Sequence, residues 1–69
     1  MTKKEIIDAF GKTLRDFGYA GLTDKEVEDS IKEALKGKPA ENIIAGFIYG
    51  WLEGDFAEIK PTVESLFGD

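Results

Sequence analysis

Apolar residues recur at helical spacing in four segments of the chain, and none of these segments alternates between apolar and polar residues as a β-strand does. Residues 3–17 place an apolar stripe, which includes Phe17, opposite a charged face. Residues 24–36 carry a narrower stripe, and residues 56–67 are interrupted by Pro61. We therefore predict an all-α fold: a compact bundle of four short helices, the last one kinked or split near Pro61.

The third apolar segment differs from the others because residues 43–52 contain no formal charge. On a helical projection its large apolar side chains cover roughly 180°, so we expect this helix to lie at the centre and to contact more than one neighbour. The side chains predicted to face the core are Ile43, Ile44, Phe47, Ile48, Trp51 and Leu52. The remaining arc holds Ala45, Gly46, Tyr49 and Gly50.

Capping signals mark the ends of these helices. Thr2 and Thr23 are each followed by a glutamate three residues later, which is the spacing of a capping box, and Asp55 and Glu58 repeat that spacing. Pro39 suits the first turn of the third helix, where a missing N–H is not needed. Glycines follow the first three helices, as expected of residues that end a helix: Gly18, Gly37 and Gly54.

The 69 residues form a single helical domain, residues 1–69, with a net charge of −5. Residues 1–40 hold eight basic and eight acidic side chains, whereas residues 41–69 hold six acidic side chains against Lys60. An acidic chain is a poor ligand for phosphates, so we expect no direct binding of nucleic acid.

The apolar segments also bear on localisation. The start of the chain lacks the apolar run of a secretory signal, and ten uncharged residues are too few for a spanning helix, which needs about 20. We expect a cytoplasmic protein that does not bind membranes.

Few residues offer chemistry. The chain contains no Cys and no His, which excludes thiolate and imidazole ligands for a metal. The densest carboxylate group, formed by Glu53, Asp55 and Glu58, could offer oxygens to Mg²⁺ or Ca²⁺, but helix capping and solvation explain these residues as well. No nucleophile or phosphate-binding loop accompanies them. We therefore predict a protein that is not an enzyme, with no catalytic residue, cofactor or metal.

The segment from Leu22 to Ala34 resembles a helix of the calmodulin-like EF-hand proteins. In that family a loop with carboxylate or amide oxygens at alternate positions follows the helix and holds calcium. The corresponding stretch here, residues 35–40, contains two lysines and no carboxylate. The resemblance therefore implies a capped amphipathic helix and no calcium site.

Two glycines four residues apart, Gly46 and Gly50, allow a close approach of another helix. One interpretation is an intramolecular contact with the first helix at Gly11. The other is a homodimer, or a groove for an unknown protein partner, in which Tyr49 and Trp51 flank the glycines. The second interpretation predicts a small non-catalytic module for protein–protein interaction or self-association.

The acidic C-terminal part suggests an alternative function. Carboxylates on one helical face can imitate the phosphates of nucleic acid and occupy the basic groove of a DNA- or RNA-binding enzyme, as inhibitors from phages and mobile elements do. The side chains that would form this acidic face are Glu53, Asp55, Glu58 and Glu64, together with Glu41. Ordinary solubility also accounts for them.

Overall fold

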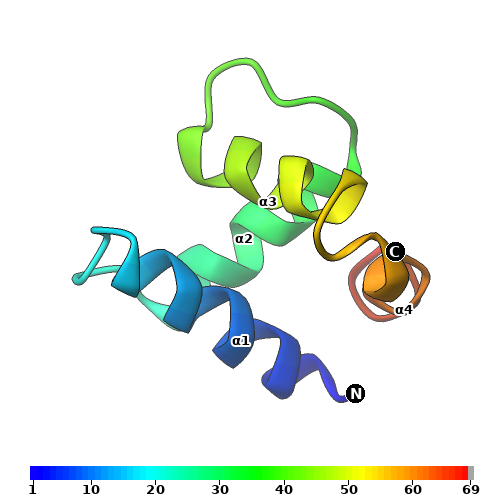
Figure 1. Cartoon of the computed structure of the whole chain (residues 1–69), viewed down its shortest axis with the longest axis horizontal. Helices are drawn as coiled ribbons and strands as arrows, with labels where there is room; N and C mark the ends of the chain where they lie inside the picture. The colour runs from blue at the N-terminus through cyan, green and yellow to red at the C-terminus, as the bar shows by residue number, and fades with distance from the viewer. Residues whose placement is uncertain (69) are drawn as a thin grey trace.

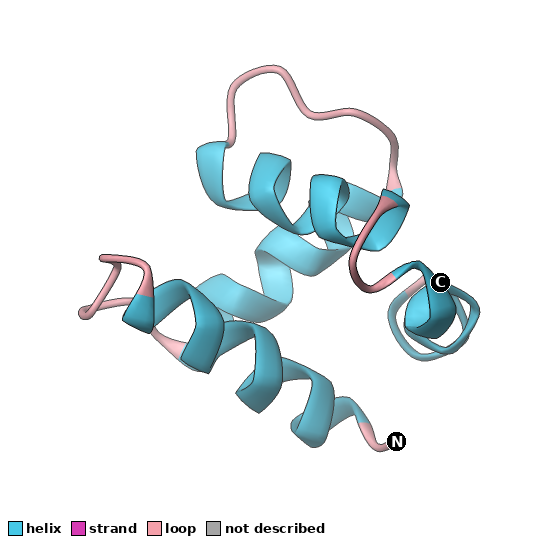
Figure 2. Cartoon of the chain, viewed as in Figure 1, coloured by secondary structure: helices cyan, strands magenta, loops and turns pink. Residues whose placement is uncertain are grey.

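The computed structural model describes residues 1–68, and the prediction of an all-α fold is confirmed. Its elements are α1 (Lys3–Asp16), α2 (Asp24–Leu35), α3 (Ile43–Glu53), the 3-10 turn η1 (Ala57–Ile59) and α4 (Lys60–Phe67), with no strand among the described residues. In Figure 1 α2 returns alongside α1, and α3 packs on α2. The loop of residues 36–42 crosses the top of the view, so α3 runs in the same general direction as α2 (Figure 2).

The beginnings of α1 and α2 are fixed by the predicted capping boxes. At α1 the Thr2 hydroxyl accepts from the Glu5 N–H, and the Glu5 carboxylate accepts from the Thr2 N–H at 2.7 Å. Thr23 and Glu26 make the same reciprocal pair at α2. These bonds satisfy N–H groups that have no partner inside the helix, so the local sequence is sufficient to define both starts.

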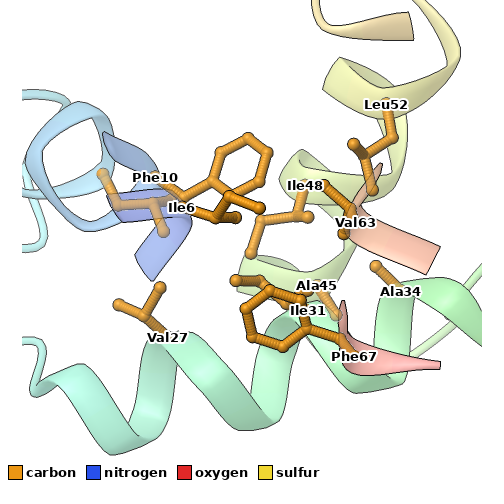
Figure 3. Packing of buried hydrophobic residues seen from close by; sticks show 11 residues of the cluster. Ile6, Phe10, Val27, Ile31, Ala34, Ala45, Ile48, Leu52, Val63 and Phe67 are labelled. Carbon is orange, nitrogen blue, oxygen red and sulfur yellow. The ribbon is translucent and has the colours of Figure 1, made fainter. Parts of the chain in front are cut away.

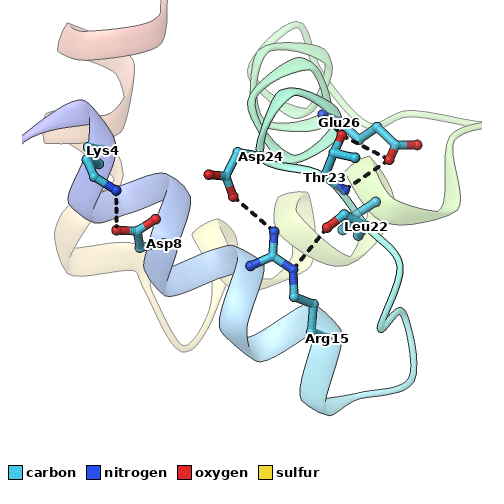
Figure 4. A network of polar contacts seen from close by, with 7 residues as sticks. All are labelled: Lys4, Asp8, Arg15, Leu22, Thr23, Asp24 and Glu26. Carbon is cyan, nitrogen blue, oxygen red and sulfur yellow. Dashed lines mark hydrogen bonds and ion pairs between the residues drawn. The ribbon is translucent and has the colours of Figure 1, made fainter.

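The turn between α1 and α2 is held by Arg15, which Figure 4 shows reaching across it. Its Nε donates to the Leu22 carbonyl at 3.0 Å, and its Nη2 donates to the Asp24 carboxylate at 2.9 Å. A methyl group at Gly11 would lie 3.1 Å from Nη1 of Arg15. Gly11 therefore makes room for this guanidinium.

The start of α3 differs from the prediction. Pro39 lies in the preceding loop, and the helix begins at Ile43, after Asn42. The Asn42 side-chain oxygen accepts from the Ala45 N–H at 3.0 Å, which is the bond expected of a helix-capping residue. Proline lacks an N–H group that the first turn of a helix does not need, but its side chain cannot accept a hydrogen bond from the free N–H groups of that turn. The helix therefore starts after Asn42, whose side chain can accept one.

Pro61 divides the C-terminal segment in two, as predicted. It lies in the first turn of α4, where its missing N–H removes no helix bond, and η1 precedes it. The predicted cap of Asp55 and Glu58 is wrong, because neither η1 nor α4 has a side-chain cap. The chain turns instead through a backbone bond from the Phe56 N–H to the Trp51 carbonyl, 2.6 Å long.

The core lies where all four helices meet (Figure 3). From α3 it receives Ala45, Ile48 and Leu52, which are at most 2% exposed. The buried side of α3 is therefore rotated by roughly 80° from the predicted one, at 100° per residue. The short Ala45 side chain points toward α2 in Figure 3. A larger side chain at this position would keep α3 further away from α2.

Two assignments to the core are wrong, and the rotation of α3 explains the first of them. Ile43 is 67% exposed, although its size and helical position place it in the predicted apolar arc. Phe17 is 63% exposed because α1 ends at Asp16 and the chain turns away at Gly18, whose φ is +131°. Ala45, predicted to lie outside the core, is fully buried.

We expect the two capping boxes to make stability depend on pH in acid. The backbone N–H and hydroxyl of Thr2 and Thr23 lower the pKa of Glu5 and Glu26 from the usual 4.5. A depressed pKa in the folded state stabilises above the unfolded value, and that contribution is lost as pH falls below about 4.5. The urea midpoint of a Glu5→Gln, Glu26→Gln variant should therefore fall less than that of the wild type between pH 6 and pH 3. Parallel curves would contradict this account of the caps.

The rotation of α3 predicts opposite behaviour for two isoleucines of one helix. Ile48→Ala should reduce the free energy of unfolding by about 2–5 kcal/mol, and Ile48→Val by about 1 kcal/mol if the alanine variant does not fold. Ile43→Ala should change it by less than about 0.5 kcal/mol, because the side chain faces solvent. Urea denaturation measures all three, and a loss at Ile43 equal to that at Ile48 would restore the rejected orientation.

Candidate protein interaction surface

From Ile43 to Gly50 the outward side of α3 carries no charged residue, in contrast to the exposed sides of α1 and α2. Ile43 is exposed at its start, Gly50 is exposed near its end, and Gly46 and Phe47 are partly exposed between them. Phe17, at the end of α1, extends this surface, since its ring lies 5.1 Å from that of Phe47. We call these five residues the apolar face.

A row of aromatic rings adjoins the apolar face and includes its Phe47. Trp51 lies at the middle of this row and stacks on Phe47 and on Phe10, with 6.3 and 5.9 Å between the ring centroids. Phe56 meets both Phe10 and Trp51 edge to face, at 5.5 and 6.2 Å. Tyr19 extends the row at Phe47, with 6.2 Å between the two ring centroids. The row links α1 to α3, and the contacts between its rings hold Phe47 and Trp51 in place.

The glycine strip within the apolar face is open. A methyl group built on Gly46 or Gly50 would meet no atom of the described residues within 4 Å apart from the adjoining residues and the backbone of its own helix. The intramolecular interpretation is therefore wrong: these glycines do not pack against α1, and the neighbour of Gly11 is the Arg15 side chain. The space that the glycines leave beside the helix backbone faces outward.

The other two predicted contact residues lie on opposite flanks of the strip. Trp51 belongs to the aromatic row and is partly buried. Tyr49 lines a hollow on the other side, together with Leu35, Lys60 and Glu64. The structure thus brings Trp51 close to the apolar face through Phe47, and it separates Tyr49 from Phe47 by the width of the glycine strip.

The predicted acidic face is divided among several places. Glu53 accepts a 2.6 Å bond from Lys60, a contact that raises the pKa of that lysine, and Glu64 lines the same hollow. Glu58 lines a different hollow, between α1 and η1, with Met1 and Phe56. Asp55 is exposed just after α3. These carboxylates do not form one surface.

The carboxylates also lack the arrangement of a metal site in the described part of the chain, where no three acidic side chains gather to hold an ion. Glu41 stands in an open hollow of about 710 Å³ with Glu33 and Ile43, at the start of α3. Glu33 is itself 3.6 Å from the Lys36 ammonium. Glu41, in contrast to Glu33, makes no ion pair among residues 1–68.

Sequence reasoning missed Phe17 and Ile43 as surface residues. Both fit the apolar periodicity of their helices, so hydrophobicity alone assigns them to the core. For Phe17 the signal was present in the sequence: it directly precedes Gly18, and a residue at the end of a helix is less enclosed than one in its middle. For Ile43 no such local signal exists.

Comparison with protein-family models, with curated proteins and with solved structures finds no match to this chain. Among residues 1–68, every helix is too short or too polar to span a bilayer.

The open glycine strip makes a testable prediction for stability. Gly50→Ala should raise the free energy of unfolding by about 0.5–1 kcal/mol, because alanine favours the helix and its methyl group meets no neighbour. Gly18→Ala is the matched control and should lower it by about 1–3 kcal/mol, since φ is +131° there. Thermal or urea denaturation checks both, and destabilisation by Gly50→Ala would mean that the strip is packed.

Proposed function

We propose that this protein is a small non-catalytic module for protein–protein interaction and that its apolar face is the contact surface. The observation that carries the proposal is the exposure of Ile43, 67%, on a helix without a charged residue between Ile43 and Leu52. When a partner removes apolar side chains from water, the free energy of the complex falls by about 25 cal/mol per Å² of buried surface. A contiguous apolar surface on a small domain is typical of a contact site.

The geometry of the apolar face also favours a contact. Phe17, Phe47 and Ile43 project beside the glycine strip, so the surface alternates between raised side chains and exposed backbone. A partner helix can lie over the glycines and place its own side chains between the rings. Because the aromatic row already holds Phe47 and Trp51 by stacking, less side-chain freedom is lost on binding than at a surface of flexible residues.

Imitation of nucleic acid has no comparable support. It requires a row of carboxylates on one surface, whereas Glu53 and Glu64 lie around Lys60 and Glu58 lines another hollow. We therefore develop only the interaction module.

Site-specific photocrosslinking in the native cells would test this function. A Cβ atom at Gly50 meets no atom of the described residues outside the backbone of its own helix, so a photoreactive side chain there leaves the helix toward solvent and toward any bound partner. The same amino acid at Lys25, on the exposed charged side of α2, is the matched control. We expect a discrete crosslinked protein, or a crosslinked dimer, from Gly50 and none from Lys25.

A second substitution sharpens the crosslinking test. Adding Ile43→Asp to the Gly50 probe should abolish the crosslinked species, because a carboxylate then replaces a large exposed apolar side chain of the contact. Circular dichroism should show an unchanged helix content, since Ile43 is exposed. Equal labelling from Gly50 and Lys25, or labelling that survives Ile43→Asp, would refute the proposed surface.

A further inference from the structure

We propose that the partner of the apolar face is an amphipathic helix that carries basic residues at both ends of its apolar side. This inference rests on the proposed function and names the chemistry of its partner. It follows from the charges that border the apolar face.

Both ends of α3 are acidic. Glu41 shares an open hollow with Ile43 at the start of the helix. At the other end, Glu53 lies on the line of the glycines, three residues after Gly50 and one helical turn further along. Asp55 follows as an exposed residue. The apolar face is therefore bordered by carboxylates along the direction of α3.

Basic residues do not balance this border. The chain carries no lysine or arginine between Lys38 and Lys60. The Lys60 ammonium is bound to Glu53 at 2.6 Å, and neither Glu41 nor Asp55 is paired with a basic side chain of the described residues. In contrast, six of the seven ion pairs of the described residues involve side chains of α1 or α2.

These charges disfavour a second copy as the partner. In an antiparallel pair of α3 helices, Glu41 of one copy would face Glu53 and Asp55 of the other. A parallel pair would place each carboxylate near its own equivalent. Two molecules that each carry a charge of −5 also repel one another at long range. The same carboxylates would be repelled by an anionic lipid surface.

A basic amphipathic helix fits both features. Its apolar side would cover the glycine strip and lie between the raised side chains, which is the usual way that a helix occupies an apolar surface. The residues of α3 from Ile43 to Glu53 span roughly 15 Å at 1.5 Å per residue, so the partner needs about three turns. Lysines or arginines beyond each end of those turns would then meet Glu41 at one end and Asp55 at the other.

Selection from a random peptide library displayed on phage tests this chemistry without a known partner. The full chain is the target, and the Ile43→Asp variant removes peptides that bind elsewhere. We expect the selected peptides to share two properties: apolar residues at spacings of three and four, and an excess of lysine and arginine over the unselected library. A second selection uses a Glu41→Gln, Asp55→Asn variant as the target and should retain the apolar spacing while losing the basic excess.

Binding measurements on one selected peptide provide the quantitative arm, with the single Trp51 as the fluorescent reporter. Ile43→Asp should weaken binding by at least about tenfold, because the contact loses a large exposed apolar side chain. Glu41→Gln with Asp55→Asn should weaken it by about fivefold, and so should an increase in salt that screens exposed charges. Both variants should retain the helix content of the wild type.

The possible failures of this inference are distinguishable. Selected peptides with apolar spacing but no basic excess would overturn the basic partner and leave the interaction surface standing. Sedimentation that shows a dimer abolished by Ile43→Asp would also overturn it, in favour of a second copy. A library that yields no peptide dependent on Ile43 would overturn both the inference and the proposed surface.

Discussion

The burial of Ala45, Ile48 and Leu52 in the core determines which side of α3 this protein shows to solvent. An isolated domain of this size buries only about 60% of the surface of its unfolded chain, so it cannot enclose a helix that is apolar on all sides. Once those three residues face inward, the opposite side of α3 must remain open. The apolar face is thus a consequence of the core.

Much of the fold follows from local chemistry that a sequence displays directly. Thr2 and Glu5 satisfy each other's backbone groups within one turn, and Gly18 ends α1 through a conformation open mainly to glycine. Pro61 separates η1 from α4 for an equally local reason. The cap predicted at Asp55 is absent although Asp55 and Glu58 have the spacing of a capping box. The Phe56 N–H donates to the Trp51 carbonyl there, so the chain turns before the next helix begins.

The helix that carries the candidate site could be predicted from the sequence, but the side of that helix that faces solvent could not. The absence of charge from residues 43–52 identified the helix, and the spacing of Gly46 and Gly50 identified the strip that remains open. Which side faces the core depended on tertiary packing. Ile43 has the larger apolar side chain, yet Ala45 is buried, because the small residue points toward α2. Hydrophobicity ranks these two residues in the opposite order.

Solvent paramagnetic relaxation of isoleucine methyl groups would test the central claim most directly. A soluble gadolinium chelate broadens the NMR signals of methyl groups that it can approach, and Ile43 and Ile48 belong to the same helix. In the dilute protein the account predicts strong broadening for Ile43 and almost none for Ile48, which is fully buried. Equal protection of the two methyl groups at every protein concentration would show that α3 has no open apolar face.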